Sequence, residues 1–550
     1  MMRILLLLCC SLVIGNCLFA QHVYQPLADQ AIYDFMDELA NDQLIVLPTV
    51  AKPYPRTVIA EKLRSVVKNE LANDRQRKRA EILLTDYNFE DPELELGSSF
   101  RDAYSIVPPR VRLGGEWGKV MARPIYGIQL YNTGEDSFFA SYGGAEMMAY
   151  LGRGFSAYAN IRDNYQQEIL GESTFLTRET GAAYKYGGLG GRVGADFSEF
   201  RGGITYSWDW GTVGFVKDQV QWGNHYGGAN ILSGRAPSFP MVNLELKPFK
   251  WLQFRYFHAW LVSEVIDSTR SYTYTTPSSS RFRAVYRNKH IAANLFTISP
   301  WSTLDVSFGN SIVYSDMPAH PAYFIPFAFF KAVDHTINQG IDNQNSQLFF
   351  DISYRGIKHL HLFSSVFVDE LSFTRLFDPD RRNFLSYKFG VGLSNWPFEN
   401  VGLQLDYNRT TPVTYDHRIP SLTYASNEYN LGHFLNDNAA SLNLQLWVRP
   451  HAKWNINFAY DLWQQGEQFP YDLLGDTPVD ELPFLDNIMW ESSALSADIS
   501  WVPISNFSAF IQLVYRNTES SLDTGVELLR PAFEANSDFT GGFGFRFGFK

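Results

Sequence analysis

The sequence predicts an all-β protein: a large antiparallel transmembrane β-barrel of about 18 strands, preceded by a short N-terminal α-helical segment. Segments of roughly 10 residues alternate between apolar and polar side chains, which is typical of strands that turn one face to lipid. Aromatic residues make up 16% of the 550 residues and there are 40 glycines, without long apolar runs beyond the N-terminus. Short turns and long polar loops also alternate along most of the chain.

The clearest hairpin lies between residues 441 and 463. Each arm has a face of large apolar side chains and a face of polar ones, and the turn between the arms is centred on Pro450. One face carries Leu442, Leu444, Leu446 and Val448, then Trp454, Ile456, Phe458, Tyr460 and Leu462. Because strand side chains alternate with period two, we expect this face to be outward and Asn443, Gln445, Asn457 and Asp461 to be inward.

A soluble array of β-sandwiches is the alternative, but it would not require strands of such even length. Two further strands have the same kind of apolar face: Ile204, Tyr206, Trp208 and Trp210 in one, and Val401, Leu403, Leu405 and Tyr407 in the other. A Lys or Arg on such a face would cost about 2–4 kcal/mol at the middle of a bilayer. The clearest strands carry none there.

Short turns recur along the chain and mark where successive strands of the predicted barrel are joined. They contain Pro248, Pro300, Pro397, Pro450 and Pro503, and a proline-free turn at 355–358 fills the one double interval. Proline suits a turn because it fixes φ and donates nothing to the ladder. Alternation predicts about 13 strands from residue 241 onward and about five to seven between 108 and 210. Long polar loops are expected at 211–240, 264–280, 315–345, 371–383, 410–438, 464–490 and 518–537.

The N-terminal part divides into two regions. Residues 1–20 read as a signal peptide, with Arg3, an apolar core and cleavage after Ala20, and they contain all three cysteines. Lipidation of Cys17 is the alternative. Residues 21–96 predict a periplasmic segment or plug of short amphipathic helices, the second capped by Thr57 and the third beginning at Asn73. We interpret the basic run at 75–79 as a solvated helix face. The barrel is expected to span 97–550.

Composition and motifs exclude several functions. The net charge of −12 argues against a general nucleic-acid binder. The motifs H-E-x-x-H and G-x-S-x-G are absent, so we expect no enzymatic activity, and nothing indicates a cofactor. His359 and His361 are placed on one strand face without a third ligand, so we expect no metal site there. Gly187–Gly191 predicts a turn rather than a phosphate-binding loop.

One loop has the composition of a sugar-binding site. Aromatic rings offer flat apolar surfaces, amides and imidazoles bind hydroxyls, and an Arg can hold a carboxylate with two hydrogen bonds. The candidate residues are Trp222, His225, Tyr226, Asn230 and Arg235. The alternative is that this loop folds inward to pack and seal the lumen. The loop at 315–345 adds His335 and Asn338 as candidates, but its phenylalanines predict a lid folded into the lumen.

The same loop resembles a known family. Gln221-Trp222-Gly223, Leu232-Ser233 and 236–240 resemble the signature of Wzi-type capsule-assembly outer-membrane proteins, and Gly340–Asn343 and Asp351 are similar to that family's central region. The order of parts is also similar, including the Leu47-Pro48 end of the helical segment. The resemblance implies an 18-stranded barrel plugged by helices and loops, acting as a lectin that anchors capsular or related polysaccharide. Lys550 and the acidic loops depart from the pattern and leave the glycan's identity open.

The leading hypothesis is therefore a non-enzymatic outer-membrane barrel that binds and anchors surface polysaccharide, with its long loops facing outside. Its expected partners are that polysaccharide, outer-membrane lipid and a periplasmic protein docked on the helices. A porin or specific channel is the first alternative, and it requires an open lumen. An accessory barrel of an export machine is the second.

Overall fold

The computed structural model describes residues 21–47, 50–91, 93–94, 96, 104–106, 109–134, 136–186, 195–337, 341–378, 381–475, 477–521 and 538–548. The expected signal peptide lies outside the described residues, as do the Gly187–Gly191 turn, Asn338, Gly340 and Lys550. No described helix is long and apolar enough to cross a membrane.

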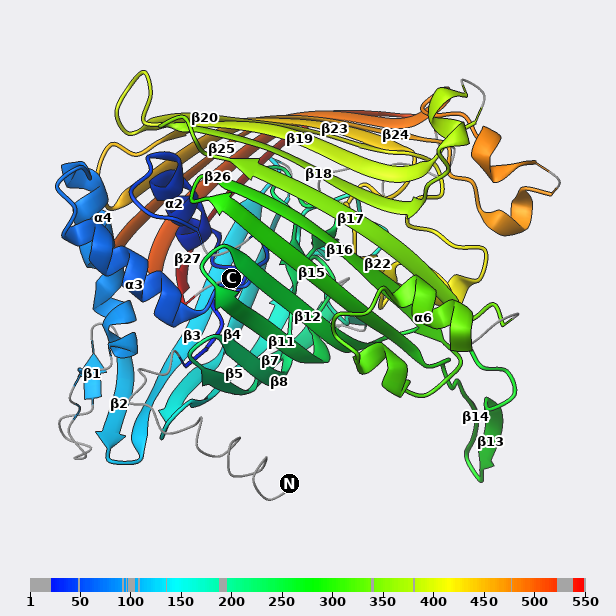
Figure 1. Cartoon of the computed structure of the whole chain (residues 1–550), viewed down its shortest axis with the longest axis horizontal. Helices are drawn as coiled ribbons and strands as arrows, with labels where there is room; N and C mark the ends of the chain where they lie inside the picture. Colours follow the sequence, from blue (N-terminus) through cyan, green and yellow to red (C-terminus); the bar gives the residue numbers. More distant parts are fainter. Residues whose placement is uncertain are drawn as a thin grey trace, which may run out of the picture.

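Within the described residues, 18 antiparallel strands form a closed barrel (Figure 1). Each strand pairs with the next in the ring, and β27 pairs with β3 to close it, Phe543 opposite Leu130. The strands are β3 (Gly118–Asn132), β4 (Ser137–Leu151), β5 (Phe155–Gln166), β7 (Ala195–Trp208), β8 (Gly211–Asp218), β11 (Phe239–Phe249), β12 (Leu252–Leu261), β15 (Lys289–Trp301), β16 (Leu304–Ser315), β17 (Gln344–Tyr354), β18 (Leu360–Glu370), β19 (Phe384–Ser394), β20 (Val401–Thr410), β23 (Ala439–Val448), β24 (Trp454–Gly466), β25 (Ile488–Ile504), β26 (Phe507–Ser520) and β27 (Phe539–Phe547).

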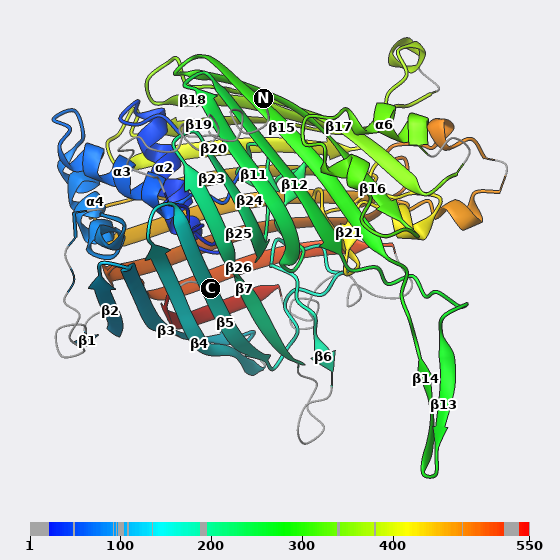
Figure 2. The same cartoon turned by 60° about the horizontal axis from the view of Figure 1, so that its bottom comes forward.

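Shorter elements lie at the two ends of the barrel. At the end where the turns are short, β2 continues the edge of β3 beyond the last residue of β27. At the other end, which we call the loop end, β13 and β14 form a hairpin that projects sideways past the barrel wall (Figures 1 and 2). The short strands are β1 (Tyr104–Ile106), β2 (Pro109–Gly115), β6 (Lys185–Tyr186), β9 (Gln221–Trp222), β10 (Leu232–Ser233), β13 (Tyr272–Thr276), β14 (Ser279–Arg283), β21 (Ala425–Ser426) and β22 (Tyr429–Asn430).

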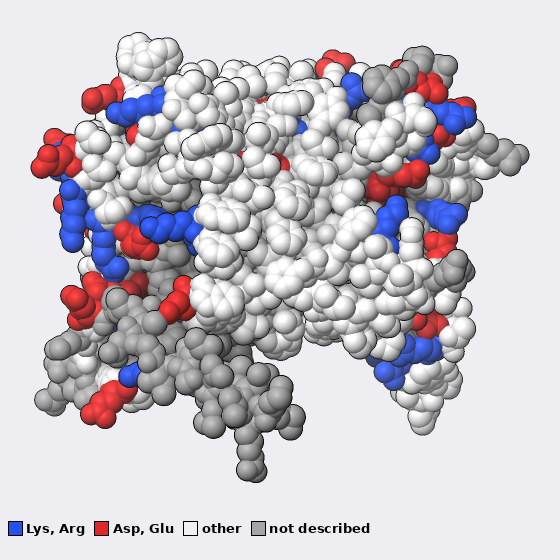
Figure 3. Space-filling model, in the orientation of Figure 1, with Lys and Arg blue, Asp and Glu red and all other residues white. Residues whose placement is uncertain are grey.

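The barrel wall has an apolar outer face and a polar inner face, as the alternation predicts. Leu405 and Leu446 are exposed on the outside, whereas Asn443 and Asp461 are buried inside. Lys, Arg, Asp and Glu gather at the two ends of the view in Figure 3, with a largely uncharged band between them. Exposed aromatic side chains mark the short-turn end: Trp210, Phe249, Trp251, Trp301, Trp396, Phe398, Trp454 and Trp501. Such a band and girdle are typical of outer-membrane barrels.

The strand count from residue 241 onward is confirmed, but two details of the turns differ from the prediction. Residues 211–218 form strand β8 rather than the start of a loop. Pro248, Pro300 and Pro503 lie in the last residues of their strands rather than at the turn itself. Each stands where the strand pairing shifts register. Because proline cannot donate to the ladder, it is tolerated where the ladder is already interrupted.

Three helices, α2 (Gln30–Asn41), α3 (Arg56–Val67) and α4 (Asp74–Tyr87), pack together at the short-turn end (Figure 1). The third helix lies where it was predicted, and Asn73 caps it through a capping box with Gln76. Thr57 does not cap α3, because the helix begins at Arg56 with Pro55 as its N-cap and Thr57 already lies within the first turn. Short 3-10 turns complete the helical elements: η1 (Asn88–Glu90), η2 (Pro321–Phe324), η3 (Thr374–Phe377), η4 (Pro420–Leu422), η5 (Tyr471–Leu473) and η6 (Val479–Glu481).

The basic run of α4 is partly buried, so its interpretation as a solvated face was wrong. Arg75 forms an ion pair with Glu38 of α2 and a hydrogen bond of 2.6 Å with Asn400 of the barrel. Arg79 donates to the backbone oxygen of Ala452 in the β23–β24 turn. Arg75 and Arg79 are four residues apart, so the helical period places both on the side of α4 that meets the barrel, where hydrogen bonds bind their guanidinium groups.

Buried ion pairs fasten the helices to the barrel wall. Asp86 of α4 accepts from Arg56 at 2.8 Å and from Arg123 of β3 at 2.7 Å. Glu90 accepts from Arg56 at 2.6 Å and from Tyr150 of β4 at 3.0 Å. Burial alone raises the pKa of Asp86, but the charges of Arg123 and Arg56 outweigh it and hold that pKa well below its usual range. Removing one member would leave buried charges uncompensated, so the helices are a fixed part of the barrel.

The two histidines do not share a strand face. His359 lies in the β17–β18 turn with a positive φ of 72° and contacts Asp42 of α2 at 2.7 Å. His361 lies in β18, where its ring contacts Tyr226 and Ser353 inside the barrel. His359 does not follow the strand alternation, because its left-handed backbone turns the side chain in another direction.

The loop between β16 and β17 folds over the outside of the barrel, so its prediction as a luminal lid was wrong. It contains helix α6 (Phe330–Ile337), which Figure 1 shows in front of β16 and β17 near the loop end. Tyr323 and Phe330 of this loop pack on Phe254 and Ile312 of the wall. The wall presents Asn294 and Asn310 beneath the loop, and these polar groups bind its backbone.

Candidate functional site

The lumen is crossed by residues 219–238, the loop between β8 and β11. Gln221 pairs with Lys52 of the N-terminal segment through two backbone hydrogen bonds of 2.8 and 3.0 Å. Asn224 donates to Asp351 of β17 at 2.9 and 2.7 Å from its backbone and side chain. The loop therefore reaches from the loop end down to the segment that closes the short-turn end.

Two backbone N–H groups at the centre of this loop meet a wall carboxylate. Tyr226 and Gly227 each donate to Asp406 Oδ2 of β20 at 2.6 Å. Gly227 approaches so closely that a Cβ there would lie 2.8 Å from the Asp406 carboxylate, which explains the need for glycine. Hydrogen bonds to a charged acceptor are the stronger ones, so the loop is held rigidly.

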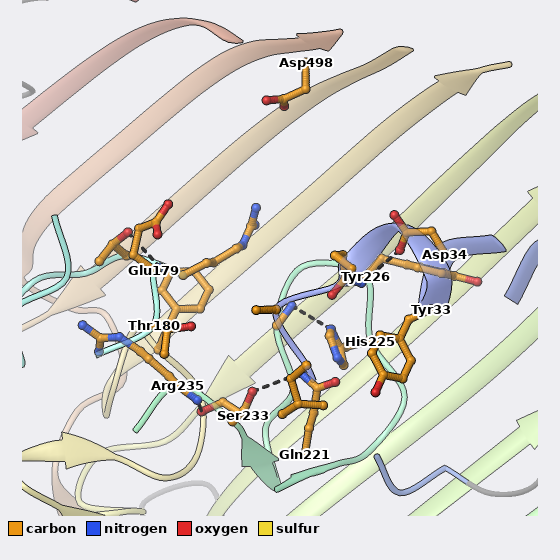
Figure 4. Close-up of a pocket in the computed structure, with 18 of the residues that line it drawn as sticks. Tyr33, Asp34, Glu179, Thr180, Gln221, His225, Tyr226, Ser233, Arg235 and Asp498 are labelled. Atoms are coloured by element: carbon orange, nitrogen blue, oxygen red, sulfur yellow. Dashed lines mark hydrogen bonds between the residues drawn. The ribbon is translucent and has the colours of Figure 1, made fainter. Parts of the chain in front are cut away.

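Beside the loop, the lumen contains a chamber of about 660 Å³. Figure 4 shows Tyr33 and Asp34 of α2 on one side of it, and Thr180 and Arg235 on another. The wall contributes many side-chain amides and the loops contribute aromatic rings. Its lining includes Gln129, Asn164, Gln404, Gln445, Asn457, Gln512, Tyr131, Tyr142, Phe434 and Trp463. A volume of this size falls in the range of small-ligand pockets, about 300–1,000 Å³.

Two ion pairs line the chamber. Arg178 of the β5–β7 loop binds Asp461 of β24 at 2.6 Å and donates to the backbone oxygen of Gly227 at 2.8 Å. Arg162 and Glu199 of the wall pair at 2.7 Å. The chamber therefore offers amides, aromatic faces and two neutralised ion pairs, groups that can bind a hydroxyl-rich ligand.

His225 presents a ring nitrogen whose hydrogen-bonding capacity is unused. Its Nδ1 accepts from the backbone N–H of Gly228 at 3.2 Å. Burial and then the charges of Lys52, Lys388 and Arg178 lower its pKa well below the usual value, so the ring is neutral. With Nδ1 as acceptor, the proton lies on Nε2. Nε2 is buried and has no hydrogen-bond partner among the described residues.

Two more chamber residues share this property. Arg235 donates through Nη2 to the backbone oxygens of Glu172 and Phe175 at 2.8 and 2.6 Å and stacks over the Tyr429 ring, while its buried Nε and Nη1 have no hydrogen-bond partner within the described chain. Burial lowers the pKa of Arg235 to about 10, so it stays charged. The indole Nε1 of Trp463 is likewise buried without a partner among the residues described. Such groups cost free energy unless something binds them.

Three other predicted residues have packing or framework roles. Trp222 is 2% exposed, lies outside the chamber and packs edge-on against Phe257 at 5.3 Å. Asn230 is fully buried and donates to the backbone oxygen of Ser386 at 3.0 Å. Tyr226 lines the chamber, but its hydroxyl contacts Asp37 at 3.3 Å and His361 at 2.9 Å.

The candidates from the second loop do not join this group. His335 is exposed on α6, outside the barrel. Asn338 is outside the described residues. The seven predicted residues therefore do not form one site: His225, Tyr226 and Arg235 meet at the chamber and the other described ones do not.

Sequence reasoning missed Trp463, Arg178 and Gln445. The alternation of β23 and β24 already places Gln445 and Trp463 on the inner face, so a signal for the wall residues was present. Arg178 lies in a loop without any recognisable pattern. Only the tertiary structure shows that this loop folds inward to meet β24.

Comparison with known proteins bears on the fold. A scan against protein-family models and a search of curated proteins found no match. Among solved structures, the chain is similar to Wzi from Escherichia coli, an outer-membrane protein of group 1 capsule assembly described as a carbohydrate-binding β-barrel. The TM-score is 0.54 at 11% identity, over 96% of this chain and 100% of that one.

Two Pseudomonas aeruginosa barrels align less extensively. OccD3 gives a TM-score of 0.41 at 8% identity, over 78% of this chain and 91% of its own. OprD gives 0.38 at 9% identity, over 78% and 92%. At 11% identity the likeness to Wzi concerns the fold, and it extends over nearly the whole of both chains. The chain has the fold of the Wzi barrel: a closed antiparallel barrel of the outer-membrane type with 18 strands and a helical N-terminal segment.

Proposed function

We propose that this protein is a non-enzymatic outer-membrane barrel that binds and anchors capsular or other surface polysaccharide at the cell surface. The observation that carries the proposal is the group of buried, unpartnered donors at one chamber, His225 Nε2, Arg235 Nε and Nη1, and Trp463 Nε1. They stand beside amides and aromatic rings, the combination that binds sugar hydroxyls and sugar ring faces.

The shape of the lumen favours retention over passage. The N-terminal segment contacts strands around the ring: Thr205 of β7 binds the backbone of His22, Ser394 of β19 binds Asn41, and Arg123 of β3 binds Asp86. The inward loop at 219–238 adds a second obstruction. A porin of this width would hold an aqueous channel.

The orientation follows from the same arrangement. In outer-membrane barrels the short turns face the periplasm and the long loops face outside. The helices at the short-turn end then face the periplasm, where they could dock a periplasmic protein, and the long loops at the other end face the cell surface. The uncharged outer band would contact outer-membrane lipid.

The test is a deletion strain complemented with the wild-type gene or with chamber variants, scored for surface-retained against shed polysaccharide. We expect deletion to release polysaccharide into the medium. Gln445→Leu with Gln512→Leu should fail to restore retention, because two inward amides are lost. Leu405→Ile, on the outer face, is the control and should restore it.

Protein levels in the outer membrane are compared for each strain, so a folding defect is recognised directly. Unchanged retention in the deletion strain would refute the proposed anchoring.

A further inference from the structure

The loop between β16 and β17 is built against the part of the barrel that other loops leave bare. We call residues Met317–Ile337 the strap. It leaves the loop end and descends over the outer face of β12, β15 and β16. Phe327 packs on Phe254 at 4.4 Å between ring centroids, only two residues from the short-turn end of β12 at Leu252. The strap therefore covers much of the height of the wall.

The face under the strap is the outer one. Phe257 of β12 contacts Trp222 inside the barrel, so Phe254, Tyr256 and His258 point outward. Tyr256 stands opposite Asn294 of β15, and Asn294 stands opposite Asn310 of β16, so these residues share that face. Polar side chains in the middle of an apolar band require a partner.

The strap supplies those partners through its backbone. Asn294 Nδ2 donates to the oxygens of Pro326 at 3.0 Å and Ala328 at 2.9 Å. Asn310 accepts from the N–H of Phe330 at 2.9 Å. Tyr256 donates its hydroxyl to the oxygen of Tyr323 at 2.9 Å. These side chains of the wall thus form hydrogen bonds with backbone groups of the strap that its irregular conformation would otherwise leave unpaired.

The exposed side of the strap is apolar from Phe324 to Phe329, whereas helix α6 exposes Lys331, His335 and Thr336. Phe324 is 36% exposed, Ile325 54%, Phe327 57% and Phe329 49%. These four residues continue the apolar band of the neighbouring wall, where Val306, Phe308, Phe350 and Ile352 are exposed. Between Phe324 and Phe329 the strap exposes apolar side chains while the wall satisfies its backbone, which is the arrangement that hydrocarbon demands of any segment within it.

We infer that residues Phe324–Phe329 of the strap are inserted in the hydrocarbon region of the outer membrane, with acyl chains as their partner. Irregular backbone at membrane depth is tolerated only where protein satisfies it, and the outward Asn294, Asn310 and Tyr256 do so here. The inference does not depend on polysaccharide binding. It makes this loop an anchor in the membrane rather than part of the surface that meets the glycan.

Single-cysteine labelling tests the inference. The three cysteines of the chain all precede residue 21, so a mature chain starting at Gln21 has none. Ile325→Cys and Phe327→Cys are labelled with an environment-sensitive fluorophore and reconstituted in phosphatidylcholine vesicles that contain doxyl-labelled lipid. Leu405→Cys on the outer wall is the positive control, and Tyr274→Cys on the projecting β13–β14 hairpin is the aqueous control.

We expect the strap labels to be quenched by the doxyl lipid to within about twofold of Leu405→Cys, and Tyr274→Cys to be unquenched. Strap labels that behave like Tyr274→Cys while Leu405→Cys is quenched would overturn the inference and leave the barrel intact. Ile325 is the safer site, because replacing Phe327 would remove its ring contact with Phe254 of the wall.

Discussion

At the scale of single residues, the chamber is defined by hydrogen-bonding groups that the protein itself does not use. His225 is the clearest, because its tautomer follows from its own contacts: Nδ1 accepts from Gly228, so Nε2 is a donor. A buried donor without a partner costs about 1–3 kcal/mol. A ligand hydroxyl at this point would recover part of that cost.

Substitution of His225 should therefore separate binding from folding. His225→Leu removes the donor, and glycan binding should weaken by about 1 kcal/mol, or about fivefold in Kd. His225→Gln keeps an N–H donor near the same place and should retain most of the affinity. Titration of purified protein with oligosaccharide prepared from the surface polymer measures both. Equal affinity of His225→Leu and wild type would exclude this group from binding.

The buried carboxylate Asp86 controls the attachment of the helices. Asp86→Asn leaves Arg56 and Arg123 without their shared anion, so the unfolding free energy should fall by about 3–5 kcal/mol. Denaturant unfolding in detergent measures the change. Asp74→Asn is the matched control, because Asp74 is exposed and pairs with Arg77 on the helix surface. A change as small as that of the control would contradict a structural role for Asp86.

The Asp86 carboxylate also predicts that the unfolding free energy depends on pH. The folded pKa of Asp86 lies below its unfolded value, which is about 3.9. Its contribution is therefore complete above about pH 5 and is lost as the pH falls toward the folded pKa. Between pH 7 and pH 3.5, wild type should lose more unfolding free energy than Asp86→Asn does. Parallel losses in the two proteins would show that another carboxylate governs acid sensitivity.

At the scale of elements, two long loops of similar composition, residues 219–238 and the strap, fold in opposite directions. The 219–238 loop turns into the lumen, where Asp351 and Asp406 accept its N–H groups. The strap turns outward, where Asn294 and Asn310 bind its backbone. The deciding factor is the face on which each strand carries its polar partners, since a one-residue change in register would exchange the two faces.

Asn310→Leu should release the strap. The change leaves the N–H of Phe330 unpaired, while it makes the wall beneath more apolar and thus suited to lipid. A label at residue 325 should then lose part of its quenching by doxyl lipid. Asn132→Leu, at the β3–β4 turn, is the matched control and should leave the signal unchanged. Full quenching at residue 325 in Asn310→Leu would show that Asn310 does not hold the strap.

At the scale of the whole molecule, the barrel is closed twice across its lumen. The helical segment contacts strands around the ring at the short-turn end, and the 219–238 loop meets it at Lys52. An 18-stranded barrel emptied of both would carry ions. This double obstruction supports the proposed binding function over that of a channel.

Conductance measurements test this closure. Wild-type protein in planar bilayers should give no steady channel current. A variant with residues 219–237 replaced by a four-residue Gly-Ser link should also give none, since α2 and residues 50–54 still line the floor of the lumen. Steady currents through wild type would refute the closed lumen. Currents in the loop variant alone would show that the helices do not close the barrel by themselves.

Much of the barrel could be predicted from sequence because the relevant signal is local. The alternation around Leu444 and Phe458 depends only on strand geometry, and it correctly separated the outer face from the inner face. Thr57 and the 75–79 run were misread because Pro55 and the buried partners Glu38 and Asn400 lie outside any local pattern. The candidate site was found only in part, since Trp463 and Arg178 come from segments far from residue 225.

Local periodicity was therefore enough to establish an antiparallel barrel, its approximate strand number and the faces of its strands. The direction in which each long loop folds, the chamber at His225 and Arg235, and the strap on the outer wall were decided in three dimensions. The physical reason is that a loop goes where its backbone N–H and C=O groups find partners. Those partners lie on distant strands, at positions that only closure of the barrel brings together.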